Sequence, residues 1–256
     1  MGTRPVVLVT GAAKRVGRVI ALDLAAHGFD VAVHYRGSHA QAQATAAEAR
    51  ELGADADSFG ADLAIEAETR ALLPAVVARF RRIDAVVNNA SAFEYDAAPS
   101  FSYAMLARQM NANTAPAVVL AQALHDHLED CSELGCVVNL LDQKLWNPNP
   151  DYFSYTLSKA ALEAATTMLA MALAPRVRVC AVAPGVTLPS GAMAQAEFER
   201  SHRLTPLGRS STPDDVARSV RFLIESPAIT GTTLLVDGGQ HLAAQPRDVV
   251  FLARPT

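Results

Sequence analysis

The alternation of short valine-rich runs with longer alanine- and leucine-rich stretches is the feature that most constrains the fold of this chain. The valine-rich runs lie at 5–10, 30–35, 84–88, 135–141, 177–182 and 233–236. The stretches with helical periodicity lie at 16–27, 39–52, 66–81, 103–129, 152–174 and 213–225. Apolar strands that alternate with helices predict a parallel sheet covered by helices on both faces. The pattern therefore predicts a doubly wound α/β fold.

The chain has no composition shift that would mark a linker between two domains. Its 256 residues fit one doubly wound domain, so we expect a single domain over 1–256. The least regular stretch, 184–206, carries Pro189, Gly191 and Pro206. Such a stretch predicts a loop over a binding site, here the substrate loop.

Charge and composition exclude several classes of partner. The formal net charge is −4, and no block of like charge is present, so neither nucleic acid nor an anionic membrane is attracted over long range. No signal-peptide pattern and no run of eighteen apolar residues occurs. We therefore expect a cytoplasmic protein with a small-molecule partner.

Cysteine and histidine positions do not form a metal site. Cys131 and Cys136 lack a second pair of ligands, and the three cysteines are expected to be free thiols. His125 and His127 are two residues apart, so on a helix they point in roughly opposite directions. We expect no bound metal.

The turn after the first strand, Thr10 to Gly17, has the composition of a phosphate-binding turn. Gly11 and Gly17 leave room for a pyrophosphate at the N-terminus of the next helix, where free N–H groups and the helix dipole favour negative charge. Two glycines also occur in turns that only reverse the chain. The turn therefore needs support from other motifs.

The end of the second strand favours NADP over NAD. NAD enzymes normally place an acidic residue there to bind the ribose hydroxyls, and no Asp or Glu is present. Guanidinium groups suit bidentate phosphate binding, and Arg15 is expected to reach the adenosine phosphate. The alternative is a polar turn that only opens the next helix. The candidate donors are Arg15, Arg36, His34 and Ser38.

Tyr155 and Lys159 are one helical turn apart and therefore share a face of their helix. An ammonium beside a phenol favours the phenolate, so this spacing predicts a lowered pKa for Tyr155 and a role in proton transfer. The same spacing also occurs by chance as a surface pair.

Several motifs in order give the chain a resemblance to the short-chain dehydrogenase/reductase family. They are Thr10 to Gly17, Asn88 to Ser91, Asn113, the Tyr155 and Lys159 pair, Pro184-Gly185, and Val236 to Gly239. The resemblance implies a seven-stranded parallel Rossmann sheet and a proton relay of Asn113, Tyr155 and Lys159. It also implies a homotetramer that packs its long middle helices and last strand.

Asp142 departs from the family pattern, which has a serine thirteen residues before the tyrosine. A hydroxyl only hydrogen-bonds a carbonyl, whereas a carboxyl group can also deliver a proton. This difference favours a ring C=N bond as the target. The alternative is a carboxylate occupied by hydrogen bonds in a turn.

Within the family, the chain is most similar to the pteridine reductases. The shared positions are Thr10 to Arg15, His34, Tyr35, Ser38, Asn89 to Ser91, Phe93, Asp142, Tyr155 and Lys159. The resemblance implies that Phe93 stacks on a pterin, that Asp142 and Tyr155 manage its protons, and that NADPH supplies the hydride. Lys159 would bind the nicotinamide ribose.

Two sets of site residues follow. The cofactor set is Gly11, Lys14, Arg15, Val16, Gly17, His34, Tyr35, Arg36, Ser38, Asp62, Leu63, Asn89, Ala90, Ser91, Tyr155, Lys159, Pro184, Gly185, Val186 and Thr187. The substrate set is Ser91, Phe93, Asp142 and Tyr155.

Two other functions stay open at this point. The first is a general carbonyl or 3-oxoacyl reductase, in which Asp142 would simply replace the serine. The second is a scaffold that senses NADPH and keeps the fold without turnover. The stretch 186–193 is the part least like the family pattern. The tail after Gly239 is long enough to cover a pocket or to reach a neighbouring subunit.

Overall fold

The computed structural model describes residues 4–129, 133–189 and 193–252. Seven parallel strands form one sheet in the order β3-β2-β1-β4-β5-β6-β7, which confirms the predicted doubly wound Rossmann fold. The strands are β1 (Val6–Val9), β2 (Asp30–Tyr35), β3 (Ala56–Gly60), β4 (Ala85–Asn88), β5 (Gly135–Leu140), β6 (Val177–Pro184) and β7 (Thr233–Val236).

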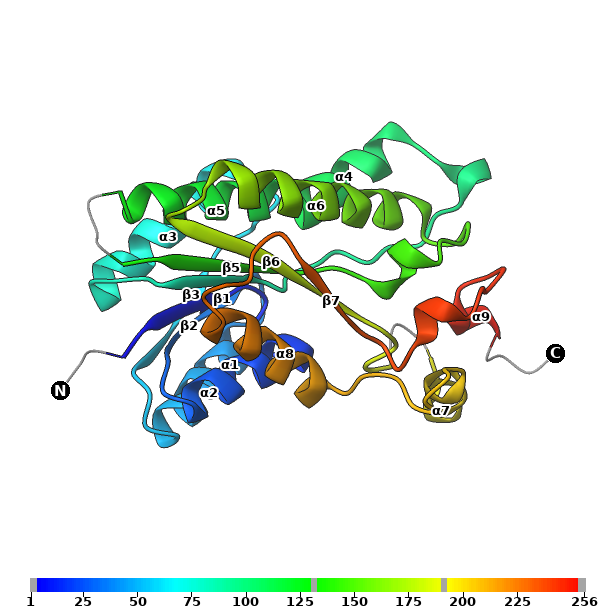
Figure 1. Cartoon of the computed structure of the whole chain (residues 1–256), viewed down its shortest axis with the longest axis horizontal. Helices are drawn as coiled ribbons and strands as arrows, with labels where there is room; N and C mark the ends of the chain where they lie inside the picture. The colour runs from blue at the N-terminus through cyan, green and yellow to red at the C-terminus, as the bar shows by residue number, and fades with distance from the viewer. Residues whose placement is uncertain (1–3, 130–132, 190–192, 253–256) are drawn as a thin grey trace.

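Helices cover both faces of the sheet (Figure 1). One layer holds α1 (Arg15–Ala26), α2 (His39–Glu51) and α8 (Pro213–Glu225). The other holds α3 (Glu66–Phe80), α4 (Tyr103–Asn113), α5 (Ala115–His127) and α6 (Phe153–Ala172). Alternate residues of β1 enter the two cores: Val7 and Val9 pack with the first layer, and Val6 and Leu8 with the second.

Three elements differ from the sequence prediction. The range 103–129 is two helices, because Pro116 has no N–H group to donate to the carbonyl of residue 112. The valine-rich runs did not include the edge strand β3. Its middle residues are only half-buried, so the strand does not need an apolar sequence pattern. The substrate loop is not wholly irregular, because it contains α7 (Gln195–Arg203). Gly191 lies outside the described residues.

Cys136 and Cys180 are buried free thiols, and burial raises the pKa of Cys136 to about 12. Cys131 lies outside the described residues. In the described ranges, no three His, Cys, Asp or Glu side chains come together as a metal-binding group. None of the helices in that part of the chain has the length and apolar character to span a membrane.

The strand order determines where a ligand fits. β1 pairs with β2 on one side and with β4 on the other, so the connections leave β1 and β4 in opposite directions. In open α/β sheets such a switch point leaves a crevice at the carboxyl ends of the strands. The turn after β1 and the segment after β4 both open onto this crevice.

Candidate active site

The turn between β1 and α1 is closely packed around its two glycines. A Cβ atom on Gly17 would lie 2.4 Å from the carbonyl oxygen of Gly11 and 2.5 Å from Nδ2 of Asn89. Gly11 has φ +65°, and the Asn89 amide donates to the carbonyl of Thr10 at 2.9 Å. Only glycine fits at position 17, and its absence of a side chain brings the start of α1 to the crevice.

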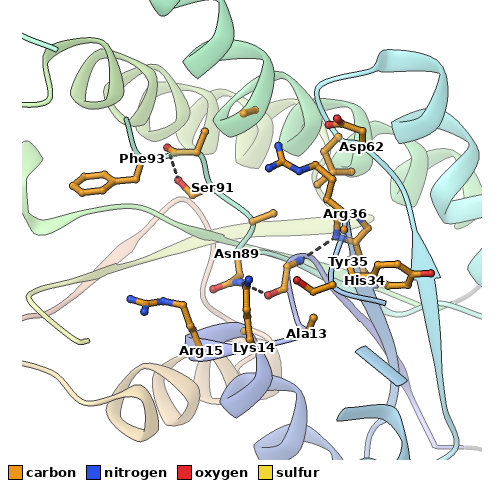
Figure 2. Close-up of a pocket in the computed structure, with 18 of the residues that line it drawn as sticks. Ala13, Lys14, Arg15, His34, Tyr35, Arg36, Asp62, Asn89, Ser91 and Phe93 are labelled. Carbon is orange, nitrogen blue, oxygen red and sulfur yellow. Dashed lines mark hydrogen bonds between the residues drawn. The ribbon is translucent and has the colours of Figure 1, made fainter. Parts of the chain in front are cut away.

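A cavity of about 670 Å³ lies against this turn (Figure 2). The cavity brings together the residues of the predicted cofactor set that belong to the glycine turn, the end of β2, and the segments after β3 and β4. The predicted residues that line it are Gly11, Lys14, Arg15, Val16, Gly17, His34, Tyr35, Arg36, Ser38, Asp62, Leu63, Asn89, Ala90, Ser91 and Phe93. The lining also includes Ala13, Gly37 and Ala64, which the sequence analysis did not select.

Lys14 and Arg36 line this cavity and have exposed side chains. No hydrogen bond or ion pair engages either side chain within the described ranges. Ser38 stands at the N-cap of α2, and its side chain makes no capping bond to that helix. These three groups are available to an anion such as a phosphate.

His34 is not available to a ligand, contrary to the expectation from its position. Its side chain is buried, Nδ1 accepts a hydrogen bond from the Gly11 N–H at 3.0 Å, and Nε2 donates to the carbonyl of Ala61 at 3.1 Å. The neutral ring thus ties the glycine turn to the end of β3. His34 thus contributes to the wall of the cavity, and both of its ring nitrogens are engaged within the protein.

We expect the His34 ring to make the protein less stable in mild acid. Burial lowers its pKa, so between the folded value and about 6.5 the unfolded chain binds more protons than the folded one. The free energy of unfolding therefore falls as pH falls through that window. Urea denaturation at pH 7.5 and 5.5 measures it, and His34→Gln should show a smaller loss. Equal losses of unfolding free energy in the two proteins would contradict the role of His34 in this pH dependence.

Arg15 also lies differently from the prediction. It has φ +56°, and its guanidinium donates to the carbonyl of Pro189 at 2.8 Å. Figure 2 shows this side chain directed away from His34 and Arg36. Arg15 therefore does not reach the adenosine end, and it joins the glycine turn to the substrate loop.

A second cavity, of about 320 Å³, adjoins the first. Arg15, Val16, Ser91 and Phe93 line both cavities, so these residues form the junction between them. The other predicted residues that line the second cavity are Asp142, Tyr155, Gly185, Val186 and Thr187. The Tyr155 hydroxyl donates to Oδ2 of Asp142 at 3.0 Å.

The pKa of Tyr155 is raised, not lowered as its spacing from Lys159 predicted. Burial raises this pKa well above its ordinary range, and the negative charge of Asp142 raises it further. Lys159 has less influence, because its Nζ lies 5.8 Å from the ring centroid of Tyr155 and donates to the carbonyl of Leu140 at 2.6 Å. Tyr155 is therefore a neutral phenol beside Asp142.

Burial also raises the pKa of Asp142, and the charge of Asp248 adds to the effect. The N–H of Lys144 partly opposes it by donating to Oδ1 of Asp142 at 2.9 Å. A carboxyl group with a raised pKa beside a phenol retains a proton more readily, as a general acid requires.

Asn113, Lys159 and Pro184 do not line either cavity. Asn113 is buried, and its amide donates to the carbonyl of Ala92, to Gln109 and to Ser158. Its Oδ1 accepts from the N–H of Ala92 at 2.7 Å. The Asn113 side chain thus fixes the segment after β4. Burial lowers the pKa of Lys159 to about 8.

Phe93 presents an aromatic surface at the junction of the cavities. It is 41% exposed, and Tyr152 stacks on it with the ring centroids 4.1 Å apart and an interplanar angle of 17°. Tyr155 meets Phe93 edge to face at 4.7 Å. Tyr152 supports one face of Phe93, and an aromatic ligand stacks well on such a platform.

The sequence analysis missed the residues at the far end of the second cavity. Gln143 and Lys144 follow Asp142, and the C-terminal residues Gln245, Asp248 and Val250 lie more than ninety positions later. No motif marks the C-terminal residues, and only the length of the tail pointed to a covering role. The Oε1 atom of Gln143 is buried without a hydrogen-bond partner.

Comparisons with known proteins agree with this geometry. The structure matches an alternative dihydrofolate reductase, FolM, from Brucella canis in complex with NADP, with 41% identity, a TM-score of 0.87, and 93% and 95% of the two chains covered. An uncharacterised oxidoreductase from Methylorubrum extorquens is 34% identical, covering 91% and 96%. The 3-oxoacyl-[acyl-carrier-protein] reductase FabG of Staphylococcus aureus is 32% identical, covering 92% and 97%.

A family model described as enoyl-(acyl carrier protein) reductase matches residues 11–241. This match includes the glycine turn, the segment after β4, and the Tyr155 and Lys159 pair. The chain belongs to the short-chain dehydrogenase/reductase family, and it is an oxidoreductase of that family.

Proposed function

We propose that this protein reduces a pterin-type substrate, a dihydropterin, with NADPH. The hydrogen-bonded pair of Asp142 and Tyr155, on the wall of a cavity that also exposes Phe93, is the observation that carries the proposal. A flat heteroaromatic ring stacks on Phe93, and its C=N nitrogen needs a proton that a carboxyl and phenol pair can deliver. The similarity to a FolM alternative dihydrofolate reductase supports the same substrate class.

The first cavity fits a dinucleotide with an additional phosphate. The glycine turn allows close approach of a pyrophosphate, and Lys14 lines the same cavity. Arg36 and Ser38 follow the end of β2, where the chain has no carboxylate. NADP is bound in the similar FolM structure. We infer that these residues hold NADPH, which supplies a hydride to the substrate carbon when it is bound.

The chain itself then manages one proton for each turnover. Tyr155 donates its hydroxyl proton to the substrate nitrogen, and the protonated form of Asp142 returns a proton to the phenolate across the 3.0 Å hydrogen bond. Solvent then reprotonates Asp142 before the next turnover. Lys159 lines neither cavity in this structure, and its ammonium would have to leave the carbonyl of Leu140 to reach a cofactor ribose. Asn113 positions the Ser91 to Phe93 segment through its bonds to Ala92. One hydride and one proton convert C=N to HC–NH, so the step balances.

The second candidate is a carbonyl or 3-oxoacyl reductase, which the similarity to FabG favours. In that case Asp142 only replaces a hydrogen-bonding serine. A scaffold that senses NADPH is less well supported, because the buried Asp142 and Tyr155 pair has no role in a protein without turnover.

Turnover on two substrate panels distinguishes these functions. We expect NADPH oxidation with dihydropterins, and in Asp142→Ser a loss of about 10²–10⁴-fold in kcat/KM, because a hydroxyl does not replace a proton-donating carboxyl. The matched control is Asp126→Ser, which removes an exposed carboxylate from α5. Turnover of 3-oxoacyl or simple ketone substrates alone, with little loss in Asp142→Ser, would establish the second candidate instead.

We also propose a homotetramer. Met168 and Met171 on α6 are 61% and 78% exposed, and Tyr103 on α4 is 86% exposed. On the other side, the apolar edge strand β7 is only partly covered, and Phe222 of α8 is 48% exposed. Two separate apolar faces fit two kinds of contact with further copies. A single-chain mass by light scattering would contradict this assembly.

A further inference from the structure

The C-terminal segment, residues 243–252, lies across the second cavity of its own chain. It ends in α9 (Val249–Leu252), which packs beside α7 of the substrate loop (Figure 1). The Ser201 hydroxyl of α7 donates to the carbonyl of Val249 at 3.3 Å. Gln245, Asp248 and Val250 line the cavity that Asp142 and Tyr155 also line.

One attachment of this segment is the ion pair between Arg247 and Asp151. Two guanidinium nitrogens of Arg247 donate to the two carboxylate oxygens of Asp151 at 2.7 and 2.8 Å, and the N–H of Asp248 donates at 2.8 Å. Burial alone would raise the pKa of Asp151, but these hydrogen bonds lower it overall. Asp151 is thus an ionised anchor just before α6.

The second attachment is a nearly buried ion pair, with the Nζ of Lys144 3.1 Å from Oδ2 of Asp248. The two side chains are 4% and 14% exposed, and the same ammonium donates to the carbonyl of Asp151 at 2.6 Å. Lys144 follows Asp142 by two residues, and its N–H holds the Asp142 carboxylate. The segment is therefore attached to the same turn that presents Asp142.

Aromatic contacts continue from the segment to Phe93. The Phe251 ring lies 5.5 Å from Tyr95 and 6.3 Å from Tyr152, centroid to centroid, and Tyr152 stacks on Phe93. Tyr152 has φ +52°, a left-handed conformation that costs free energy for any residue other than glycine. The surrounding contacts hold Tyr152 in this conformation, so the segment supports the platform from outside.

The position of the segment relative to the junction indicates what it meets. Arg15, Val16, Ser91 and Phe93 line both cavities, whereas residues of the C-terminal segment line only the second. The reacting atom of a substrate must lie at the junction, beside the cofactor. A substituent on the opposite side of the substrate ring then extends toward Val250 and Gln245.

We propose that residues 243–252 form a specificity-determining wall, supplied by the same chain, that selects substrates by the size of the ring substituent, and that Arg247 and Asp248 hold this wall in place. The choice of pterin ring substituents as the selected groups rests on the proposed function. The existence of the wall rests only on the cavity lining and on the two ion pairs.

Val250 allows the size of the wall to be changed without touching its attachments. The two substrates are 6-methyl-7,8-dihydropterin and 7,8-dihydrofolate, which differ in the bulk of the substituent at one ring position. We expect Val250→Phe to lower kcat/KM for dihydrofolate by about tenfold or more, with the methyl compound changed by less than about threefold. Val250→Ala should move the ratio in the opposite direction. Leu134→Phe, on an exposed side chain before β5, is the control for added bulk.

Arg247→Met tests the attachment with a readout that does not need turnover. Trp146 is the only tryptophan of the chain and lies next to Asn147, whose amide donates to the carbonyl of Ala243 at 2.5 Å. We expect acrylamide to quench Trp146 about twofold more efficiently in Arg247→Met, and KM to rise about tenfold with kcat little changed. Arg70→Met, which removes an exposed pair on α3, should alter neither. Unchanged quenching and KM in Arg247→Met would overturn the attachment.

Failure of the wall and failure of the proposed function give different results. If the wild-type protein reduces dihydropterins and both Val250 variants keep its substrate ratio, the wall is wrong and the function stands. If it reduces only 3-oxoacyl thioesters, the pterin function is wrong. The same variants are then compared on a short and a long acyl chain, where an unchanged ratio again overturns the wall.

Discussion

Tyr155→Phe is expected to lower kcat by about 10²–10⁴-fold while the protein still binds NADPH, because the variant lacks only the hydroxyl that donates to Asp142. We attribute the loss to the missing proton, because the raised pKa keeps the phenol of Tyr155 neutral and its hydroxyl is hydrogen-bonded to the Asp142 carboxyl. The ring itself remains to meet Phe93 edge to face. Single-turnover measurement of NADPH oxidation gives the rate of the chemical step, and cofactor affinity measured in parallel shows whether NADPH binding is unchanged.

The control for Tyr155→Phe is Tyr103→Phe, at a tyrosine that is 86% exposed on α4. It should keep full activity, so that the removal of a hydroxyl as such is not the cause of the loss. A Tyr155→Phe protein with more than a tenth of wild-type kcat would show that another group, Asp142 foremost, delivers the proton directly.

The second large effect concerns Gly17→Ala. The new Cβ atom would lie 2.4 Å from the backbone oxygen of Gly11 as well as 2.5 Å from the Asn89 side chain. Because a backbone atom cannot rotate away, the glycine turn has to shift. Overpacking of this kind costs roughly 1–3 kcal/mol, which corresponds to about 5–150-fold weaker cofactor binding if the turn alone absorbs it. Isothermal titration with NADPH measures the change directly.

Gly28→Ala is the matched control for that substitution, since Gly28 follows the opposite end of α1. A Cβ atom there meets nothing within 4 Å, although φ +93° makes the substitution strained. Gly28→Ala should therefore lower the free energy of unfolding and leave NADPH affinity unchanged. Equal losses of affinity in the two variants would mean that general destabilisation, and not the turn, weakens binding.

The sequence predicted the sheet, and it selected most of the residues that line the first cavity, because both depend on local patterns. Alternating apolar runs determine the strands, and Gly11 and Gly17 are required by one turn. His34 and Arg15 show the limit of such reasoning. Their positions in the motif were right, but the direction of each side chain depends on a partner far away in the chain: Ala61 for the ring and Pro189 for the guanidinium.

The pKa of Tyr155 is a similar case. Helical spacing places Lys159 on the same face, which predicts a lowered value, but burial is not visible in the spacing and acts in the opposite direction. The wall formed by residues 243–252 was beyond prediction for a different reason. Its contacts join positions about a hundred residues apart, such as Lys144 and Asp248, and no periodicity or motif records them.

The hydrogen bond from Arg15 to Pro189 joins the glycine turn to the substrate loop, so we expect it to couple the binding of the two ligands. Arg15 begins α1 and lines both cavities, and Pro189 belongs to the loop beside the substrate. A cofactor that changes the position of this guanidinium also changes the free energy of the substrate loop. Linkage then requires reciprocity, so the factor by which cofactor alters substrate affinity equals the factor by which substrate alters cofactor affinity. We therefore expect this one arginine, which lines both cavities, to make the binding of the two ligands cooperative within a single chain.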